Sequence, residues 1–204
     1  IKLKPDNAEA YNNRGIVFMN EKRNDEALND FNRVIKLKPG FVKAYNNRGI
    51  VFMNEKRNDE ALADFNKAIA LKNDYTEAYN SRGAVLMNET RYDSALNDFN
   101  RAIKLKPDYA ESYNNRGNLF VNKKKINEAI KDFNKAIELK PDYAKAYNNR
   151  GKLFMNENRI DDALNDFNKA IELNYVPAYN NRNMLLKMKR ETKRRMLEAG
   201  LLLF

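Results

Sequence analysis

Hydrophobic and polar residues follow each other with the period of an α-helix, in stretches that come in pairs. In the first stretch, from Ala8 to Asn20, a helical wheel separates two opposite arcs. One arc carries Tyr11, Arg14, Gly15 and Phe18, and the other carries Glu9, Asn12, Asn13, Ile16, Met19 and Asn20. The second stretch, from Asn24 to Leu37, places Ala27, Phe31 and Val34 on one stripe. The pattern predicts two helices, with the stripe of the second packed against the first.

The predicted helix pair recurs every 34 residues along a chain of 204. The pentapeptide Tyr-Asn-Asn-Arg-Gly, with Ser for the second Asn in one copy, begins at Tyr11, Tyr45, Tyr79, Tyr113 and Tyr147. A second block, Asp-Phe-Asn, recurs at Asp30, Asp64, Asp98, Asp132 and Asp166. One helix pair cannot bury its apolar stripe alone, so we expect successive pairs to stack.

The five Pro residues lie at the junctions between copies, where proline ends a helix. They predict five repeats, a terminal half repeat and a leading remnant. The repeats are expected at 8–41, 42–75, 76–109, 110–143 and 144–177, and the half repeat with a basic tail at 178–204. Residues 1–7 match the end of a repeat, so we expect the chain to begin inside one and to be a piece of a longer protein.

Composition argues against an enzyme. The chain has no Cys, which excludes thiol catalysis and Cys-based metal sites, and no His, the commonest general base and metal ligand. No Gly-rich phosphate loop is present, and we expect neither a cofactor nor a metal. The sequence shows no signal peptide and no apolar run of membrane-spanning length, so cytoplasmic or nuclear placement is expected.

The repeat resembles the tetratricopeptide repeat. The resemblance rests on the order and spacing of Tyr11, Gly15, Phe18, Ala27, Phe31, Val34 and Pro39, which recur through residues 8–173. Tyr replaces Trp at the first signature position, and Arg14 replaces Leu before the Gly. The resemblance implies an all-α fold, a right-handed α-solenoid of antiparallel helix pairs.

Each repeat carries an Arg on the core-facing arc of its first helix and an Asp directly before its core Phe. These arginines are Arg14, Arg48, Arg82, Arg116 and Arg150. A guanidinium on a buried face needs a partner, which favours an internal Arg–Asp pair in each repeat. The alternative is a row of arginines that binds anionic ligands. Arg182, in the half repeat, has no Asp in a following second helix.

Family resemblance implies that the first helices line a concave groove. The arc that would face it carries paired Asn, an Ile or polar position, a Met position and a closing Asn. The candidate binding residues are Asn12, Asn13, Ile16, Met19, Asn20, Asn46, Asn47, Ile50, Met53, Asn54, Asn80, Ser81, Met87, Asn114, Asn115, Asn118, Asn148, Asn149, Lys152 and Met155. Asn amides can clamp a peptide backbone, and Met adapts to varied apolar side chains. We expect the Ile and Met positions to have no role in the core.

Two known groove types offer a comparison. The Asn ladder of the nuclear sugar-transferase superhelix resembles the row Asn13, Asn47, Asn115, Asn149 and Asn181, which Ser81 interrupts. The carboxylate clamp of heat-shock co-chaperones is matched only at Asn118 and Asn149, so binding of acidic chaperone tails is not expected. Compositional bias and recent duplication would also produce recurrent Asn, as the row in the second helices from Asn32 to Asn168 illustrates.

Positive charge concentrates near the C-terminal end. The chain has 38 Lys and Arg against 28 Asp and Glu, a net charge of +10, and residues 182–204 contribute half of the excess. The first hypothesis is a non-catalytic interaction module that binds a protein or peptide segment in its groove. Alternatives are a spacer or assembly subunit that docks or stacks through its ends and convex face, and a contact of the basic helix with nucleic acid or another acidic surface.

Overall fold

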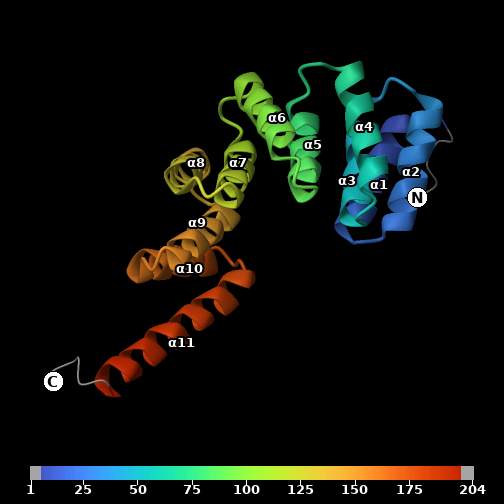
Figure 1. Ribbon diagram of the computed structural model, residues 1–204. Coiled ribbons are helices and arrows are strands. Elements are labelled where there is room, and N and C mark those ends of the chain that lie inside the picture. Colours follow the sequence, from blue (N-terminus) through green and yellow to red (C-terminus); the bar gives the residue numbers. More distant parts are fainter. Residues whose placement is uncertain (1–5, 199–204) are drawn as a thin grey trace. The chain divides into compact units, whose positions relative to one another are not determined.

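The computed structural model describes residues 6–198, and all regular structure in that range is α-helical (Figure 1). The helices are α1 (Ala8–Asn20), α2 (Asn24–Leu37), α3 (Val42–Asn54), α4 (Asn58–Leu71), α5 (Thr76–Asn88), α6 (Tyr92–Leu105), α7 (Ala110–Asn122), α8 (Ile126–Leu139), α9 (Ala144–Asn156), α10 (Ile160–Glu172) and α11 (Pro177–Glu198). The predicted all-α fold and the bounds of the first helix pair are confirmed. Most of the predicted remnant at 1–7 and the last six residues of the half repeat lie outside the described residues.

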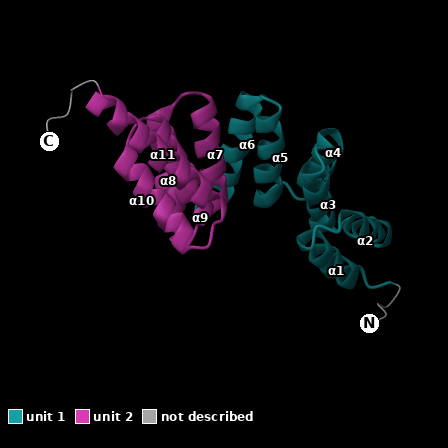
Figure 2. Cartoon of the chain, turned by 90° about the horizontal axis from the view of Figure 1, so that it is seen from below, with its two compact units in different colours: residues 1–107 teal, residues 108–204 magenta. Residues whose placement is uncertain are grey.

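The helices form two compact units, residues 1–107 and 108–204 (Figure 2). In the first unit each odd-numbered helix packs against the helix that follows it, and the first helices α1, α3 and α5 lie side by side. The second unit repeats this arrangement with α7, α9 and α11 as the neighbouring first helices. Helix pairs are therefore packed in series within each unit, as the 34-residue period predicts.

The core of each repeat is built on a close approach between its two helices. A Cβ atom at Gly49 would lie 2.7 Å from Cε1 of Phe65, which is fully buried. The same contact measures 2.7–2.8 Å in the four other complete repeats. Glycine is costly inside a helix, so its recurrence here is explained by the space that the Phe ring requires.

Within a unit, the core cluster of one repeat extends into the next. Ala27 and Phe31 of the first repeat pack with Val51 of the second, and all three are fully buried. Val17 occupies the same position in α1 as Val51 in α3 but is 52% exposed. No described helix precedes α1, so this apolar position is open to solvent.

The turns inside the helix pairs share one backbone device. The second residue after the first helix adopts a left-handed conformation, with φ between 56° and 62°, at Lys22, Lys56, Thr90, Lys124 and Asn158. The N–H of the next residue donates to a carbonyl five residues earlier, as in Arg91 to Leu86 at 2.9 Å. This is the αL helix end, which glycine or asparagine normally occupies. Thr90 is the one β-branched residue among these five.

Candidate functional site

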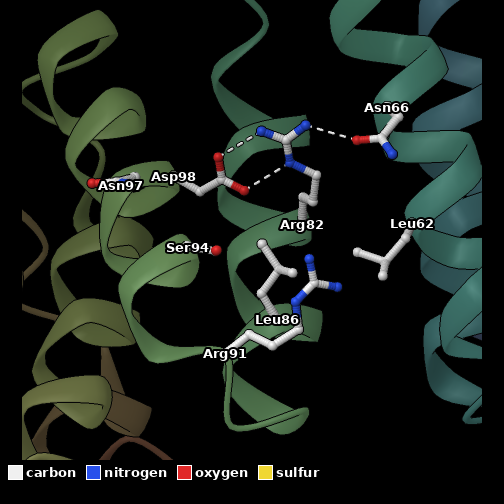
Figure 3. Close-up of a pocket in the computed structure, with 8 residues that line it drawn as sticks. All are labelled: Leu62, Asn66, Arg82, Leu86, Arg91, Ser94, Asn97 and Asp98. Carbon is white, nitrogen blue, oxygen red and sulfur yellow. Dashed lines mark hydrogen bonds and ion pairs between the residues drawn. The ribbon is translucent and has the colours of Figure 1, made fainter.

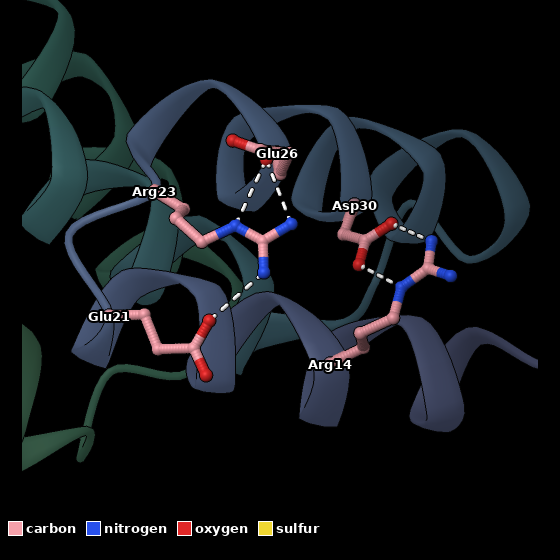
Figure 4. A network of polar contacts seen from close by, with 5 residues as sticks. All are labelled: Arg14, Glu21, Arg23, Glu26 and Asp30. Carbon is pink, nitrogen blue, oxygen red and sulfur yellow. Dashed lines mark hydrogen bonds and ion pairs between the residues drawn. The ribbon is translucent and has the colours of Figure 1, made fainter.

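The core-facing arginines form internal ion pairs. In each complete repeat the Arg donates through Nε and Nη2 to both oxygens of the Asp sixteen residues later, and the bond lengths are 2.6–2.8 Å. The pairs are Arg14–Asp30 (Figure 4), Arg48–Asp64, Arg82–Asp98, Arg116–Asp132 and Arg150–Asp166. The aspartates are only 4–5% exposed. The internal-pair interpretation is confirmed.

The electrostatics of these pairs reflect their burial. Burial raises the pKa of Asp166 above its ordinary value, and the hydrogen bonds from Arg150 oppose that shift. The hydrogen bond to Asp98 raises the pKa of Arg82, against the opposing effect of burial. Each arginine thus has its carboxylate within its own repeat.

The same arginines connect neighbouring repeats. Nη1 of Arg48 donates to Oδ1 of Asn32 at 2.6 Å, and Arg82 makes the same bond to Asn66 at 2.7 Å. Figure 3 shows Arg82 between Asp98 and Asn66, at a cavity of about 340 Å³. The other arginine in its lining, Arg91, pairs with a glutamate. The Asn row of the second helices therefore has a structural role, and both cations of this cavity are already engaged.

A second set of arginines stands at the turns, and these arginines are not among the residues predicted from the sequence. Arg23 bridges Glu21 and Glu26 (Figure 4), and its guanidinium lies 4.3 Å from the centre of the Phe18 ring. Equivalent contacts place Arg57 and Arg159 over their own aromatic rings at 4.3 and 4.1 Å. Arg recurs in the sequence just before the second helix with acidic residues on both sides, and this pattern could have predicted the ion pairs at the turns.

The first Asn of each pair lies in the interior. Asn12, Asn46, Asn80, Asn114 and Asn148 are at most 9% exposed. The second Asn of the following repeat donates Nδ2 to the buried Oδ1, from Asn47 to Asn12 at 3.2 Å, from Asn149 to Asn114 at 2.9 Å and from Asn181 to Asn148 at 2.7 Å. These paired Asn residues form a ladder between repeats. The first Asn of each pair is buried in that ladder and is not available on the surface to bind a ligand.

The ladder is broken at the third repeat. Ser81 stands where the other first helices have the second Asn. Oδ1 of Asn46, the acceptor that this position would serve, is buried and has no hydrogen-bond partner among the described residues. The substitution therefore leaves an unsatisfied acceptor in the interior, a costly arrangement.

The Ile and Met positions do contribute to the core, so the expectation that they have no core role is wrong. Ile16 and Met19 are partly buried and pack against the Phe31 cluster. Ile50 and Met53 do the same in the second repeat, and Met155 does so in the fifth. Close packing explains their apolar character without a ligand, since each lies beside a buried Phe.

The candidate side chains that remain open to solvent are mainly polar. Asn20 and Asn54 are exposed, and so is Lys152, while Asn118 is half-buried. In the second unit, side chains of α7 and α9 surround a cavity of about 290 Å³. Its lining residues are Asn118, Val121, Asn122, Asn149, Lys152, Leu153 and Asn156. Of the predicted binding residues, this cavity brings together Asn118, Asn149 and Lys152.

Residues 6–198 lack two further features. No described helix is long and apolar enough to cross a membrane. That range also contains no group of three or more acidic side chains placed to hold a metal ion.

Comparison with known proteins places the chain in a family. The tetratricopeptide repeat profile matches residues 8–41, 42–75 and 144–174, and a related TPR repeat profile matches residues 91–124 and 117–157. Together these matches cover well over half of the chain. No significant similarity to a curated protein is found.

Solved structures agree on the fold. The TPR protein TTC0263 from Thermus thermophilus superimposes with a TM-score of 0.80 at 19% identity, over 88% of this chain and 98% of that one. The APC/C hetero-tetramer Cut9–Hcn1 gives 0.82 at 21% identity, over 91% of this chain and 37% of that one. YrrB, described as a TPR protein with an unusual peptide-binding site, gives 0.60 at 23% identity, over 91% and 93%. With its repeated helix pairs and these profile matches, the chain belongs to the tetratricopeptide repeat family.

Proposed function

We propose that the chain is a non-catalytic interaction scaffold that binds an extended segment of a partner protein along its first helices. The observation that carries this proposal is the cavity between α7 and α9, which is lined by four Asn, one Lys and two apolar side chains. The relative YrrB, whose structure is described by its peptide-binding site, shares the fold and supports this direction.

The chemistry of the cavity suits a peptide backbone. Asn118, Asn122 and Asn156 each offer a donor and an acceptor, and an extended peptide presents both groups at every residue. Val121 lines the same cavity and is only partly buried, so it would contact an apolar side chain of the peptide. Lys152 supplies the one formal charge in the lining, so a peptide with a nearby acidic residue is favoured over a basic one.

The structure decides which asparagines should be changed in a test. Asn47 and Asn149 donate to buried asparagines of the preceding repeat, so their loss would weaken the stack as well as any binding. Asn118, Asn122 and Asn156 are not part of that ladder, and they line the cavity. A triple Asn118→Ala, Asn122→Ala, Asn156→Ala variant therefore separates the groove from the ladder.

The experiment selects ligands from a displayed library of random twelve-residue peptides with the intact chain as bait, and measures affinity by fluorescence anisotropy. The matched control replaces Asn29, Asn97 and Asn165, exposed asparagines of the second helices, with Ala. We expect the groove variant to lose at least tenfold in affinity and the control to match the parent chain. Equal binding by both variants, with unchanged helical circular dichroism, would refute the groove as the site.

A further inference from the structure

The last helix departs from the plan of the other first helices. Each earlier first helix ends at an Asn, and the chain turns back two residues later through a left-handed residue, as at Asn156 and Asn158. In α11 the corresponding positions, Met188 and Arg190, remain helical, and the helix continues to Glu198. The side of α11 that a second helix would cover is therefore open within the described part of the chain.

Exposure along α11 agrees with this reading. Tyr179 is 44% exposed, whereas Tyr45 at the same repeat position is 8% exposed. Asn183, which takes the place of the repeat glycine, is also exposed. On the other side of the helix, Leu185 is fully buried against the cluster around Phe167, so α11 is docked on the preceding repeat like any first helix.

Arg182 keeps one of the two connections of a repeat arginine. Its Nη1 donates to Asn168 of the preceding second helix at 3.1 Å, as the earlier arginines do. Its Nε, which in the five complete repeats donates to an Asp, is buried and has no hydrogen-bond partner among residues 6–198. The residue sixteen positions later is Glu198, but along one continuous helix it lies roughly 24 Å away, and it pairs with Arg194.

The surroundings of this unsatisfied nitrogen are strongly positive. From Arg182 to Glu198, α11 carries seven Lys and Arg against two Glu. A buried guanidinium nitrogen without an acceptor is costly, and an incoming carboxylate would both satisfy it and match the surrounding charge. Five internal examples show that a carboxylate on a second helix reaches this nitrogen at about 2.7 Å.

We propose that the open side of α11 binds an acidic helix of a partner protein, which supplies a carboxylate to Arg182 in the way that Asp166 serves Arg150. In the complete repeats, the residue after the Asp is a Phe whose ring packs on the repeat glycine. Asn183 stands in place of that glycine, so the partner's residue after the carboxylate must be smaller than Phe. A Cβ at Gly151 would already lie 2.8 Å from Cε1 of Phe167. This site lies on α11 and is independent of the groove between α7 and α9.

A helix fits this site better than a nucleic acid or a membrane surface. The unpaired nitrogen is buried, and the same guanidinium donates to Asn168 of α10, so a single side chain must enter beside α10 to reach it. Tyr179 and Leu186 flank that place with apolar area, which a helix covers and a sugar–phosphate backbone leaves in water. No broad flat surface can approach a nitrogen in that position.

The probe is a fluorescein-labelled, side-chain-stapled peptide copied from residues 160–173, in which Phe167→Ala removes the ring and the acid at 166 is retained. The staple is needed because an isolated helix of this length is marginal in water. A matched probe carries Asp166→Asn in addition. Binding to the intact chain and to its Arg182→Gln variant is measured by anisotropy.

We expect the Asn probe and the Arg182→Gln chain each to lose at least tenfold in affinity, and their combination to lose little more than either alone. A probe that keeps Phe167 should bind the parent chain more weakly and bind the Asn183→Gly variant more tightly. No binding of the acidic probe at millimolar concentration, or equal binding to the parent and Arg182→Gln chains, would overturn the proposal. The proposal would also be overturned if single-stranded RNA or anionic vesicles bound the parent chain in a way that depends on Arg182 while binding of the acidic peptide did not depend on it.

Discussion

Replacing Ser81 with Asn should stabilise the protein, although the side chain lies on the face where a ligand is proposed to bind. Asn46 is 4% exposed, and its Oδ1 has no partner among the described residues. In three other places an Asn at the position of Ser81 donates to the matching acceptor of the preceding repeat, at 2.7–3.2 Å. The serine hydroxyl is too short to take over that bond.

The magnitude follows from the burial of the acceptor. A hydrogen bond of this type contributes about 0.5–1.5 kcal/mol net, and an unsatisfied buried acceptor costs about 1–3 kcal/mol. Ordering a longer side chain offsets part of the gain, by about 0.5 kcal/mol. We therefore expect Ser81→Asn to raise the free energy of unfolding by about 1 kcal/mol, or Tm by roughly 3 °C for a chain of this size.

Urea unfolding followed by circular dichroism at 222 nm measures the effect, with Ser81→Ala as the control that adds no donor. The same substitution is also made in an Asn46→Ala background, where the unsatisfied acceptor no longer exists. In the Asn46→Ala background we expect Ser81→Asn to give no rise in the free energy of unfolding. A gain that persists without Asn46, or no gain in the parent chain, would refute it.

Five other substitutions test the repeat geometry by the same unfolding measurement. Thr90→Asn should stabilise by about 1 kcal/mol, because a β-branched residue at φ 59° is strained; a loss of stability would contradict the αL assignment. Gly49→Ala should destabilise by about 1–2 kcal/mol despite the better helix propensity of Ala, because its Cβ would lie 2.7 Å from the Phe65 ring. Phe65→Leu added to the Gly49→Ala chain should recover part of that lost stability. If the effects of the two substitutions simply add, the predicted contact between the added Cβ and the Phe65 ring is contradicted. Arg48→Met should cost about 3 kcal/mol by leaving a buried aspartate unpaired; Arg14→Met should cost less, because its side chain is 43% exposed against 20% for Arg48.

The repeat made the fold predictable from the sequence. The period of 34 residues, the Gly–Phe pairing and the prolines at the junctions all recur, so each copy tests the interpretation of the others. The Arg–Asp pairs could be predicted for the same reason, since a charge on the core-facing arc requires a partner. A single copy of the unit would not have distinguished these features from chance.

The surface was harder to predict, because a helical wheel assigns each residue to one of two sides. A first helix in this stack has at least three environments: its own second helix, the neighbouring repeats and solvent. Asn12 and Asn13 lie on the same arc of the wheel, yet the first is 4% exposed and the second is open to solvent. Asn12 is covered by the following repeat, and that contact is set by how the pairs stack, which the pattern within one helix does not contain.

Recurrence of Asn is therefore not in itself evidence for a ligand site. The row that begins at Asn32 accepts from the repeat arginines, and the row that begins at Asn12 accepts from the next repeat. Both rows recur because the junctions between repeats use them. The closing row, which includes Asn122 and Asn156, is exposed, and within residues 6–198 no hydrogen bond between repeats involves these two side chains. If selection for binding has shaped this protein, its effect should be concentrated in that row, and substitutions there should alter affinity while leaving the unfolding free energy within about 0.5 kcal/mol of the parent value.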